Sequence, residues 1–488
     1  MVLQAAYALA SHVLPTRYYW QTAIGVGSLV VTYAFAQGRT TNRDRDLHAR
    51  TIIVTGAFTP LGLTLISNLA SRGAHVIAIS PYSLEHPYAT LLIPAMRTAT
   101  KNENIYAEHA DLTSLASVRE FCTKFLTGED QRIDGIVFAH EYAGIGSLFS
   151  SKAVHEERRE AESVATFLMI TLLLPALLVA PVERDIRIVN VVNPFYAAAI
   201  PSFTTDIIST MTSATPPSRS LFLSEGRRAL RTIILTRHLQ RILNALPNRA
   251  PTLDAQGPGE QPKTSKDDAA NETSGKTPHN MPSNIAAVSV TPGMSRTETI
   301  RAALGADREL SPESFSLVRM LIYVVLFPVI WLLAKSSDMA MQSVLHSLFL
   351  PTPFKRTLAQ LSAAAHGSAE SKNAPAENES PAPLPTGSFI EVLKPGALYR
   401  ECSVVMLPVL PLPPADPVDE KGKKVKEKEE GRTPSSQEDL LDIEDDGEYG
   451  GEGVGRLVWE WFENHLKMWE AREKERNPER EDTKTASS

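Results

Sequence analysis

One segment of about 30 residues, Arg50 to Pro81, constrains the fold more than any other part of the chain. Thr51 to Val54 is a β-branched apolar run, which is typical of a buried strand. Gly56 to Gly62 predicts a turn, and Leu63 to Arg72 has helical spacing. His75 to Ser80 then predicts a second strand after Gly73, the glycine that ends the helix. The segment therefore predicts one βαβ unit.

The turn of this unit has the spacing of a phosphate-binding turn, with one departure. Thr55 and Gly56 follow the strand and Gly62 opens the helix, where backbone N–H groups normally seat a dinucleotide pyrophosphate. Pro60 stands between them and has no N–H to donate. The second strand ends in Ser80-Pro81, which selects neither a free ribose hydroxyl nor a 2′-phosphate.

Length and composition limit the remaining possibilities. A chain of 488 residues with 43% hydrophobic residues can bury one large domain of about 250 residues, besides membrane segments and linkers. A net charge of −7 without a basic stripe argues against a nucleic-acid partner. Cys122 and Cys402 cannot form a disulfide framework and have no metal-ligand spacing, so we expect structural thiols, a reducing compartment and no metal site.

Strands and helices alternate beyond the first unit. Strands are predicted over Ile105–Asp111, Ile133–Ala139, Arg187–Val192 and Ile285–Val290, and helices over Ser117–Phe125, Phe167–Val179 and Leu221–Leu246. Phe167–Val179 is apolar on all sides and predicts a buried helix, whereas Leu221–Leu246 is predicted to be basic and amphipathic. This alternation predicts an α/β fold with a doubly wound parallel, Rossmann-type sheet.

Tyr18 to Ala36 predicts an N-terminal membrane anchor. The segment has no charge, carries aromatic residues at both ends and is close to the roughly 20 residues that span a bilayer. A cleaved signal peptide fits less well, because the apolar run begins late and is followed by four arginines, whereas Arg17 alone precedes it. The positive-inside bias places the following domain in the cytosol. We favour the endoplasmic reticulum, with the mitochondrial outer membrane as the alternative.

Several motifs together resemble the short-chain dehydrogenase/reductase family, in its retinol-dehydrogenase-like branch. The turn Thr55-Gly56-x-x-x-Pro60-x-Gly62 resembles the family's Thr-Gly-x-x-x-Gly-x-Gly, and Asp111 resembles its aspartate beside the adenine. FLMITLLLP, RIVNV and TRHL are similar to family segments, and TPGMSRT, with Pro292 and Gly293, looks like the stretch after its sixth strand. The resemblance implies NAD(P) as cofactor, held by Thr55, Gly56, Gly62, Asp111, Pro292 and Gly293.

The same resemblance exposes an altered active site. The family uses a tyrosine as general acid, a lysine four residues later and a serine that binds the substrate carbonyl. No tyrosine in this chain has a lysine four residues later, and no lysine occurs between Lys152 and Lys263. Aligned on Thr236-Arg237, the tyrosine, lysine and serine positions carry Glu225, Ala229 and Asn193. The family's Asn-Asn-Ala-Gly becomes Phe138-Ala139-His140-Glu141, and its helix asparagine becomes Glu162.

Three segments are predicted to be disordered. They have too few apolar residues for burial to offset the entropy lost when the chain becomes ordered. The predicted organisation is an anchor and basic linker at 1–49, a Rossmann-type domain at 50–300 with a disordered insertion at 248–283, membrane-associating or cavity-capping helices at 301–365, a disordered insertion at 366–387, a closing strand region at 388–412, a charged disordered insertion at 413–453 and an amphipathic helix at 454–475.

Two apolar stretches in the C-terminal half leave alternatives open. Met320 to Ala334 contains Pro328 and is short for a membrane span, so we favour a helix on the same bilayer as the anchor over a buried flap covering a substrate cavity. Val458, Phe462, His465 and Trp469 share one helical face, and packing against the core is favoured there over membrane contact.

Two hypotheses for function remain. The first is a membrane-anchored, catalytically degenerate relative of the short-chain dehydrogenases that binds a lipid or a protein partner as a binding or scaffolding protein. The second is an NAD(P)-dependent oxidoreductase acting on a lipid, retinoid or sterol-like carbonyl, with Tyr142, Tyr196, His140 or Glu225 in a rearranged active site. The missing tyrosine–lysine pair favours the first hypothesis.

Overall fold

The computed structural model describes residues 19–128, 132–148, 152–181, 184–212, 220–246, 282–306, 315–357, 391–411 and 447–476. In these ranges eight strands form one sheet in the order β3-β2-β1-β4-β5-β6-β7-β8. The strands are β1 (Thr51–Thr55), β2 (His75–Ser80), β3 (Ile105–His109), β4 (Gly135–Phe138), β5 (Ile186–Val191), β6 (Ile285–Thr291), β7 (Leu398–Arg400) and β8 (Ser403–Val405). Neighbours are parallel except β7 and β8, so the predicted doubly wound parallel sheet is confirmed.

Each face of the sheet is buried under its own layer of helices. Side chains alternate across a strand, so Ile53 of β1 points into one hydrophobic core while Ile52 and Val54 point into the other. Helices α5 (Leu115–Thr127), α6 (Lys152–Val179), α9 (Leu221–Ala245) and α14 (Gly451–Arg476) build the first core, and α3 (Pro60–Ser71), α4 (Pro87–Thr100) and α12 (Ser337–Phe349) build the second.

Shorter elements complete the described chain. They are α7 (Tyr196–Ala199), η2 (Ile200–Ser202), α8 (Phe203–Thr212), η3 (Arg296–Ile300), α10 (Arg301–Ala303) and η5 (Glu448–Gly450). Helices α4, α7 and α8 were not predicted from the sequence. Helix α4 contains Pro94, which breaks the pattern by which a helix is recognised.

Helix α3 begins earlier than the sequence pattern indicates. Thr59 is its N-cap, with a side-chain oxygen that accepts a hydrogen bond from the Gly62 N–H at 3.1 Å, and Pro60 is the first helical residue. A proline is well placed there, because the first N–H of a helix has no partner inside it. The expected start at Leu63 was therefore wrong by one turn, and Pro60 is the first residue of the helix.

Helix α9 corrects a second expectation. The sequence predicted a basic amphipathic helix, but α9 lies between the sheet and α14, and most of its residues are buried. Two of its cations face α14 and η5 instead of solvent: the Arg231 guanidinium lies 3.7 Å from the centroid of the Trp461 ring, and Arg237 pairs with Glu448 at 3.3 Å. The sequence pattern did not predict this burial, because the polar face of α9 contacts other parts of the protein instead of water.

The predicted insertions fall mostly outside the described residues. The structure nevertheless places residues 448–453 in η5 and the start of α14, where Tyr449 is buried. The expected boundary at 453 was therefore too late. On α14, Val458 and Phe462 are fully buried in the first core, as favoured for its apolar face.

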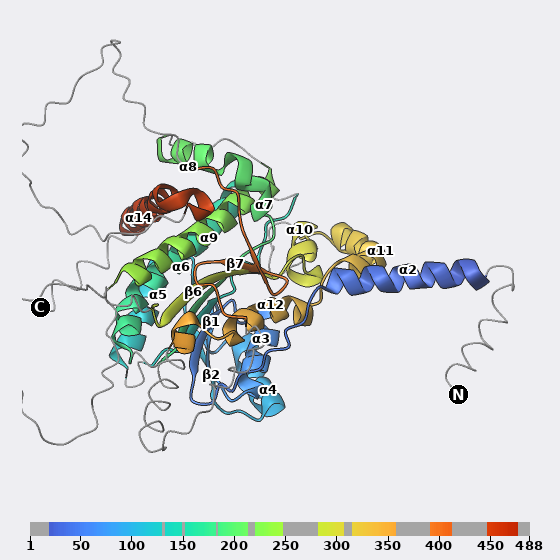
Figure 1. Ribbon diagram of the computed structural model, residues 1–488, viewed down its shortest axis with the longest axis horizontal. Helices are drawn as coiled ribbons and strands as arrows, with labels where there is room; N and C mark the ends of the chain where they lie inside the picture. The colour runs from blue at the N-terminus through green and yellow to red at the C-terminus, as the bar shows by residue number, and fades with distance from the viewer. Residues whose placement is uncertain are drawn as a thin grey trace, which may run out of the picture.

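Two apolar helices stand apart from both cores. Helix α2 (Tyr19–Gln37) projects from the body, and α11 (Leu317–Leu333) contacts it near the body (Figure 1). The side chain of Val325 is 70% exposed, and Ile330 is the buried residue of α11, so the alternative of a buried flap is wrong. In the described ranges, one helix is long and apolar enough to cross a membrane, His155–Val179 within α6, and the predicted anchor α2 falls short of that measure. More than half of His155–Val179 is buried, which places it in the core.

Gly62 sets how closely α3 approaches the turn after β1. A Cβ at this position would lie 2.1 Å from the Gly56 carbonyl oxygen, which is backbone and cannot rotate away. We expect Gly62→Ala to destabilise the protein by about 1–3 kcal/mol, the usual effect of overpacking. Thermal unfolding of the full chain in detergent measures this. Gly25→Ala in α2, where a Cβ meets nothing within 4 Å, is the control and should leave the midpoint unchanged or slightly higher.

Candidate functional site

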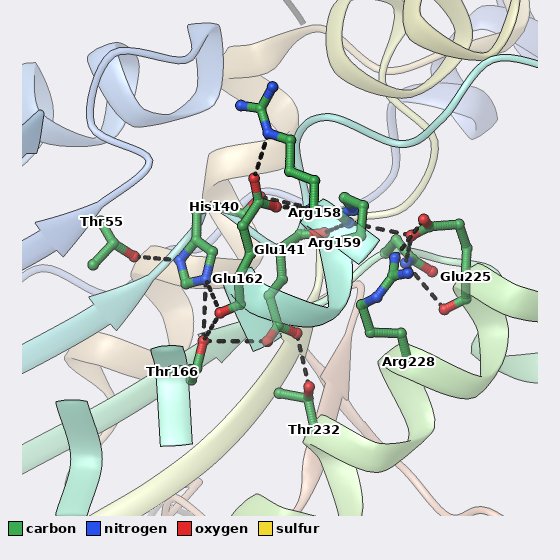
Figure 2. Close-up of polar contacts among 11 residues, drawn as sticks. Thr55, His140, Glu141, Arg158, Arg159, Glu162, Thr166, Glu225, Arg228 and Thr232 are labelled. Atoms are coloured by element: carbon green, nitrogen blue, oxygen red, sulfur yellow. Dashed lines mark hydrogen bonds and ion pairs between the residues drawn. The ribbon is translucent and has the colours of Figure 1, made fainter. Parts of the chain in front are cut away.

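The candidate site lies at the carboxyl ends of β1, β4 and β5, the edge at which doubly wound sheets bind ligands. Thr55 ends β1, His140 and Glu141 follow β4, and Asn193 follows β5. Helices α6 and α9 face these residues and add charged side chains (Figure 2). The structure therefore brings together positions that the sequence separates by up to about 170 residues, as from Thr55 to Glu225.

The Glu225 carboxylate is buried and forms ion pairs with two arginines. Its carboxylate is held by Arg159 of α6 at 3.2 Å and by Arg228, one turn further along α9 (Figure 2). The Asn193 side-chain amide donates to the same carboxylate at 3.1 Å. Side-chain exposure is 1% for Glu225 and 2% for Arg159, so the pair has left water completely. Such a pair is stable only when hydrogen bonds satisfy both charges.

The protonation state of Glu225 follows from these neighbours. Burial alone would raise the pKa of its carboxyl, but the charges of Arg159 and Arg228 and their hydrogen bonds outweigh burial and lower the pKa to about 2. Glu225 is therefore a carboxylate at neutral pH. It occupies the aligned position of the family's proton donor but has no proton to give.

The other two aligned positions are also without acid–base chemistry. Ala229 is buried one turn after Glu225 and packs in the first core. Asn193 is buried, with its amide nitrogen directed to Glu225 and its Oδ1 accepting from the Phe195 N–H at 3.1 Å. Ala229 therefore fills the core, and Asn193 links Glu225 to the backbone after β5.

A second polar cluster lies between β1 and α6. The His140 ring contacts the Thr55 hydroxyl through Nδ1 at 2.7 Å, and it contacts the Thr166 hydroxyl at 3.1 Å through Nε2 (Figure 2). The buried Glu141 carboxylate accepts from Thr166 at 3.2 Å and from Thr232 at 2.7 Å. Burial is the main cause that lowers the pKa of His140, which favours its neutral form.

Thr55 was predicted to bind the cofactor, and its hydroxyl is hydrogen-bonded to His140 in this cluster. Its neighbour Gly56 has φ of +65°, and a Cβ there would lie 2.7 Å from the His140 backbone nitrogen. Both Gly56 and Gly62 are needed for contacts within the chain. The glycines of the turn therefore do not by themselves indicate a bound nucleotide.

The N–H groups of the first turn of α3 are all used within the chain. Pro60 has none, the Leu61 N–H donates to the Glu298 carboxylate, and the Gly62 N–H donates to the Thr59 hydroxyl oxygen. The Leu63 N–H bonds the Thr59 carbonyl oxygen at 2.8 Å. A pyrophosphate needs such N–H groups, so the turn as arranged does not fit the phosphates of NAD(P).

The remaining predicted cofactor residues have local structural partners. Asp111 Oδ1 accepts from both the N–H and the hydroxyl of Thr113, at 2.9 and 2.8 Å. The Gly293 carbonyl oxygen accepts from the Tyr142 hydroxyl at 2.9 Å, and the Pro292 carbonyl oxygen accepts from Lys335 Nζ at 3.0 Å. Burial raises the pKa of Tyr142, so this hydroxyl stays protonated.

Sequence reasoning missed the residues that organise this edge. Arg159 donates to the carbonyl oxygens of His140 and Glu141 as well as to Glu162 and Glu225. Its spacing of three residues from Glu162 on a helix was a detectable signal. Glu298 lies three residues after Ser295, the spacing of a capping box, but the pattern does not show that its carboxylate reaches α3.

The fold and the glycine turn together are those of a Rossmann-type protein. No family model matches the chain. The uncharacterised oxidoreductase pbr1 of Schizosaccharomyces pombe is 25% identical over 341 residues, covering 68% of this chain and 78% of the relative. An uncharacterised oxidoreductase of Saccharomyces cerevisiae is 26% identical over 359 residues, covering 68% of this chain and 76% of the relative.

Human retinol dehydrogenase 13 is 32% identical over 111 residues, which is 23% of this chain and 32% of the relative. These matches confirm the resemblance to the short-chain dehydrogenase/reductase family, in its retinol-dehydrogenase-like branch. A solved short-chain dehydrogenase from Sphingobium yanoikuyae in complex with NADPH is 16% identical, covers 68% of this chain and 99% of that chain, and has a TM-score of 0.38.

The Glu225 network predicts a pH-dependent contribution to stability. The pKa of Glu225 falls from 4.5 to about 2 on folding, so its stabilisation is complete above pH 4.5 and is lost as the pH falls toward 2. We expect Glu225→Gln to cost about 3–5 kcal/mol at pH 7, because it leaves Arg159 and Arg228 without their anion. Denaturant unfolding between pH 2 and 7 measures both effects.

The control for this experiment is Glu120→Gln, which removes an exposed carboxylate on α5. Its unfolding midpoint should follow the wild type at every pH. Equal midpoints for Glu225→Gln and wild type at pH 7 would contradict the buried ion pair.

Proposed function

We propose that this protein is a membrane-anchored relative of the short-chain dehydrogenases that has lost the family's reaction and acts as a binding or scaffolding protein. The observation that carries the proposal is the state of Glu225. The aligned proton-donor position is a buried carboxylate held by Arg159 and Arg228, with its pKa lowered to about 2. Hydride transfer to a carbonyl needs a proton donor beside it, and a negative charge there opposes the developing alkoxide.

The alternative is a working NAD(P)-dependent oxidoreductase on a lipid, retinoid or sterol-like carbonyl or alcohol. The names of the relatives favour it, since they include oxidoreductases and a retinol dehydrogenase. It would need a replacement acid. Tyr142 donates to the Gly293 carbonyl oxygen and has a raised pKa, and the His140 ring nitrogens contact Thr55, Thr166 and the Glu162 carbonyl oxygen. Tyr196 is buried in the first core. These placements favour the non-catalytic function.

Membrane association is proposed from α2 and α11 together. Helix α2 has 19 residues without a charged side chain, about 28 Å at 1.5 Å per residue, which is close to the hydrocarbon thickness. Its Phe35 side chain is 83% exposed. Helix α11 adds a second apolar surface against it, with the Tyr33 and Trp331 rings stacked at 4.6 Å between centroids. A lipid bilayer is the occupant that matches two exposed apolar surfaces, of which α2 carries no charge and α11 carries one, Arg319, in its first turn.

The side of the membrane is proposed from charge. Arg39, Arg43 and Arg45 follow α2, and the domain follows them, so the positive-inside rule places the domain in the cytosol. Polar contacts join the domain end of α2 to that of α11: the Gln37 amide donates to the Ala334 carbonyl oxygen at 3.3 Å and accepts from the Ser336 N–H at 3.3 Å. The two helices therefore meet the body at one place. The endoplasmic reticulum is our first choice of organelle and the mitochondrial outer membrane our second.

The proposed loss of catalysis has a kinetic test. Purified full-length protein in detergent, given NADPH and retinaldehyde or a long-chain aldehyde, should turn over below about 0.1 per second, whereas ordinary enzymes work near 10 per second. Faster turnover that disappears in Tyr196→Phe or His140→Ala would establish the oxidoreductase. A rate that survives these two variants and also Tyr142→Phe and Glu225→Ala would be assigned to a contaminating enzyme.

The proposed topology has a separate test. Protease added to intact organelles should cut near residues 260 and 430, and it should leave a small N-terminal fragment protected. Removing residues 19–37 should weaken but not abolish membrane attachment, because α11 remains. Adding Leu321→Lys and Val325→Lys to that deletion should release the protein into the soluble fraction, whereas the same pair placed at exposed Glu120 and Glu460 should not. Protection of both cut sites would contradict the cytosolic placement.

A further inference from the structure

The first turn of α3 is occupied by a carboxylate from a distant part of the chain. Leu61 is the first residue of α3 with an N–H, and this N–H donates to Oε1 of Glu298, 237 residues later. Glu298 lies in η3, which follows β6 and packs against α3. It is fully buried, with 0% exposure. A negative group at a helix N-terminus is stabilised by the helix dipole and by charge-assisted hydrogen bonds.

The other oxygen of Glu298 is held equally firmly. Oε2 accepts from the Ser295 hydroxyl at 2.7 Å and from the Thr297 hydroxyl at 2.9 Å. One carboxylate thus collects a backbone N–H and two hydroxyls in a site closed to water. These are the kinds of donors that hold a phosphate group in Rossmann-type proteins.

The local sequence frees Glu298 for this contact. In an ordinary capping box the glutamate side chain would bond the backbone N–H of the serine three residues before it. Here Ser295 accepts from the Glu298 N–H at 3.0 Å, but the Ser295 N–H goes to the Thr299 hydroxyl at 3.3 Å. The Thr299 hydroxyl therefore accepts the hydrogen bond that the glutamate carboxylate accepts in an ordinary capping box. The Glu298 carboxylate is released from its own helix and directed to α3.

The segment that carries Glu298 is fixed on both sides. The Tyr142 hydroxyl bonds the Gly293 carbonyl oxygen, and Lys335 exchanges backbone hydrogen bonds with Met294 and Arg296, at 3.0 and 3.1 Å. Lys335 Nζ also bonds the Pro292 carbonyl oxygen at 3.0 Å and pairs with Glu401. Glu298 is held in place by a rigid support and is not a flexible side chain that happens to lie nearby.

We infer that the Glu298 carboxylate is a built-in substitute for the nucleotide pyrophosphate at the N-terminus of α3. It supplies the negative charge that this turn would otherwise take from NAD(P), and it excludes the cofactor's phosphates by both volume and charge. The chain keeps the fold of a nucleotide-binding protein because an internal anion stabilises the turn that a cofactor normally stabilises. The inference concerns the cofactor seat and does not depend on the loss of the proton donor at position 225.

The test compares four variants of the full chain in detergent. Glu298→Ala empties the seat, Glu298→Ser empties it while leaving a hydroxyl for Ser295 and Thr297, and Glu298→Gln fills it with a neutral group of the same shape. Glu141→Ala is the matched control, because Glu141 is a buried carboxylate that also accepts from two threonine hydroxyls but lies away from α3. Thermal unfolding is measured with and without inorganic pyrophosphate at about 5 mM. NADPH binding is measured by the fluorescence of the nucleotide.

We expect pyrophosphate to raise the midpoint of Glu298→Ala and Glu298→Ser by several degrees, on the order of 3 °C, and to leave wild type, Glu298→Gln and Glu141→Ala unchanged. NADPH should bind Glu298→Ala or Glu298→Ser at least about tenfold more tightly than wild type. Glu298→Ser decides the question if Glu298→Ala does not fold. The inference is overturned if pyrophosphate acts on all variants alike or on neither emptied variant, or if wild type binds NADPH as tightly as the emptied variants.

Discussion

The carboxyl edge of the sheet depends on the hydrogen bonds and ion pairs of one side chain, Arg159. From one position on α6, its guanidinium reaches the backbone after β4, the Glu225 carboxylate on α9 and Glu162 on its own helix. Placing a guanidinium at 2% exposure is costly unless its donors find acceptors, and these acceptors come from three separate elements. The relative positions of β4, α6 and α9 are thus coupled through one side chain.

Much of the fold could be predicted from the sequence because the strands of a doubly wound sheet are buried on both faces. The runs at Ile52, Ile77, Ile136 and Val189 are β-branched and continuous, and they all became strands of the sheet. Helix α9 was misjudged in character because burial of arginines depends on partners elsewhere, such as Trp461. Such partners are set by tertiary structure, which a local period does not record.

The candidate site was less predictable than the fold. Alignment located positions 193, 225 and 229, but it could not show that Glu225 meets Arg159, because the two lie 66 residues apart on different helices. The same holds for Leu61 and Glu298. A hydrogen bond between distant elements leaves no spacing in the sequence, so residues that belong to one polar group look like unrelated surface charges until the fold brings them together.

The position of α14 has a consequence for the order in which the protein folds. This helix covers α6 and α9, and Trp461 and Phe462 are buried in the first core, next to residues encoded some 300 positions earlier, such as Phe167. During synthesis α6 and α9 therefore emerge with the faces that α14 later covers still exposed. At roughly 5–20 residues per second, the ribosome needs on the order of 15–60 s to make the missing cover. Such a nascent chain is a natural client for chaperones that bind exposed apolar surface.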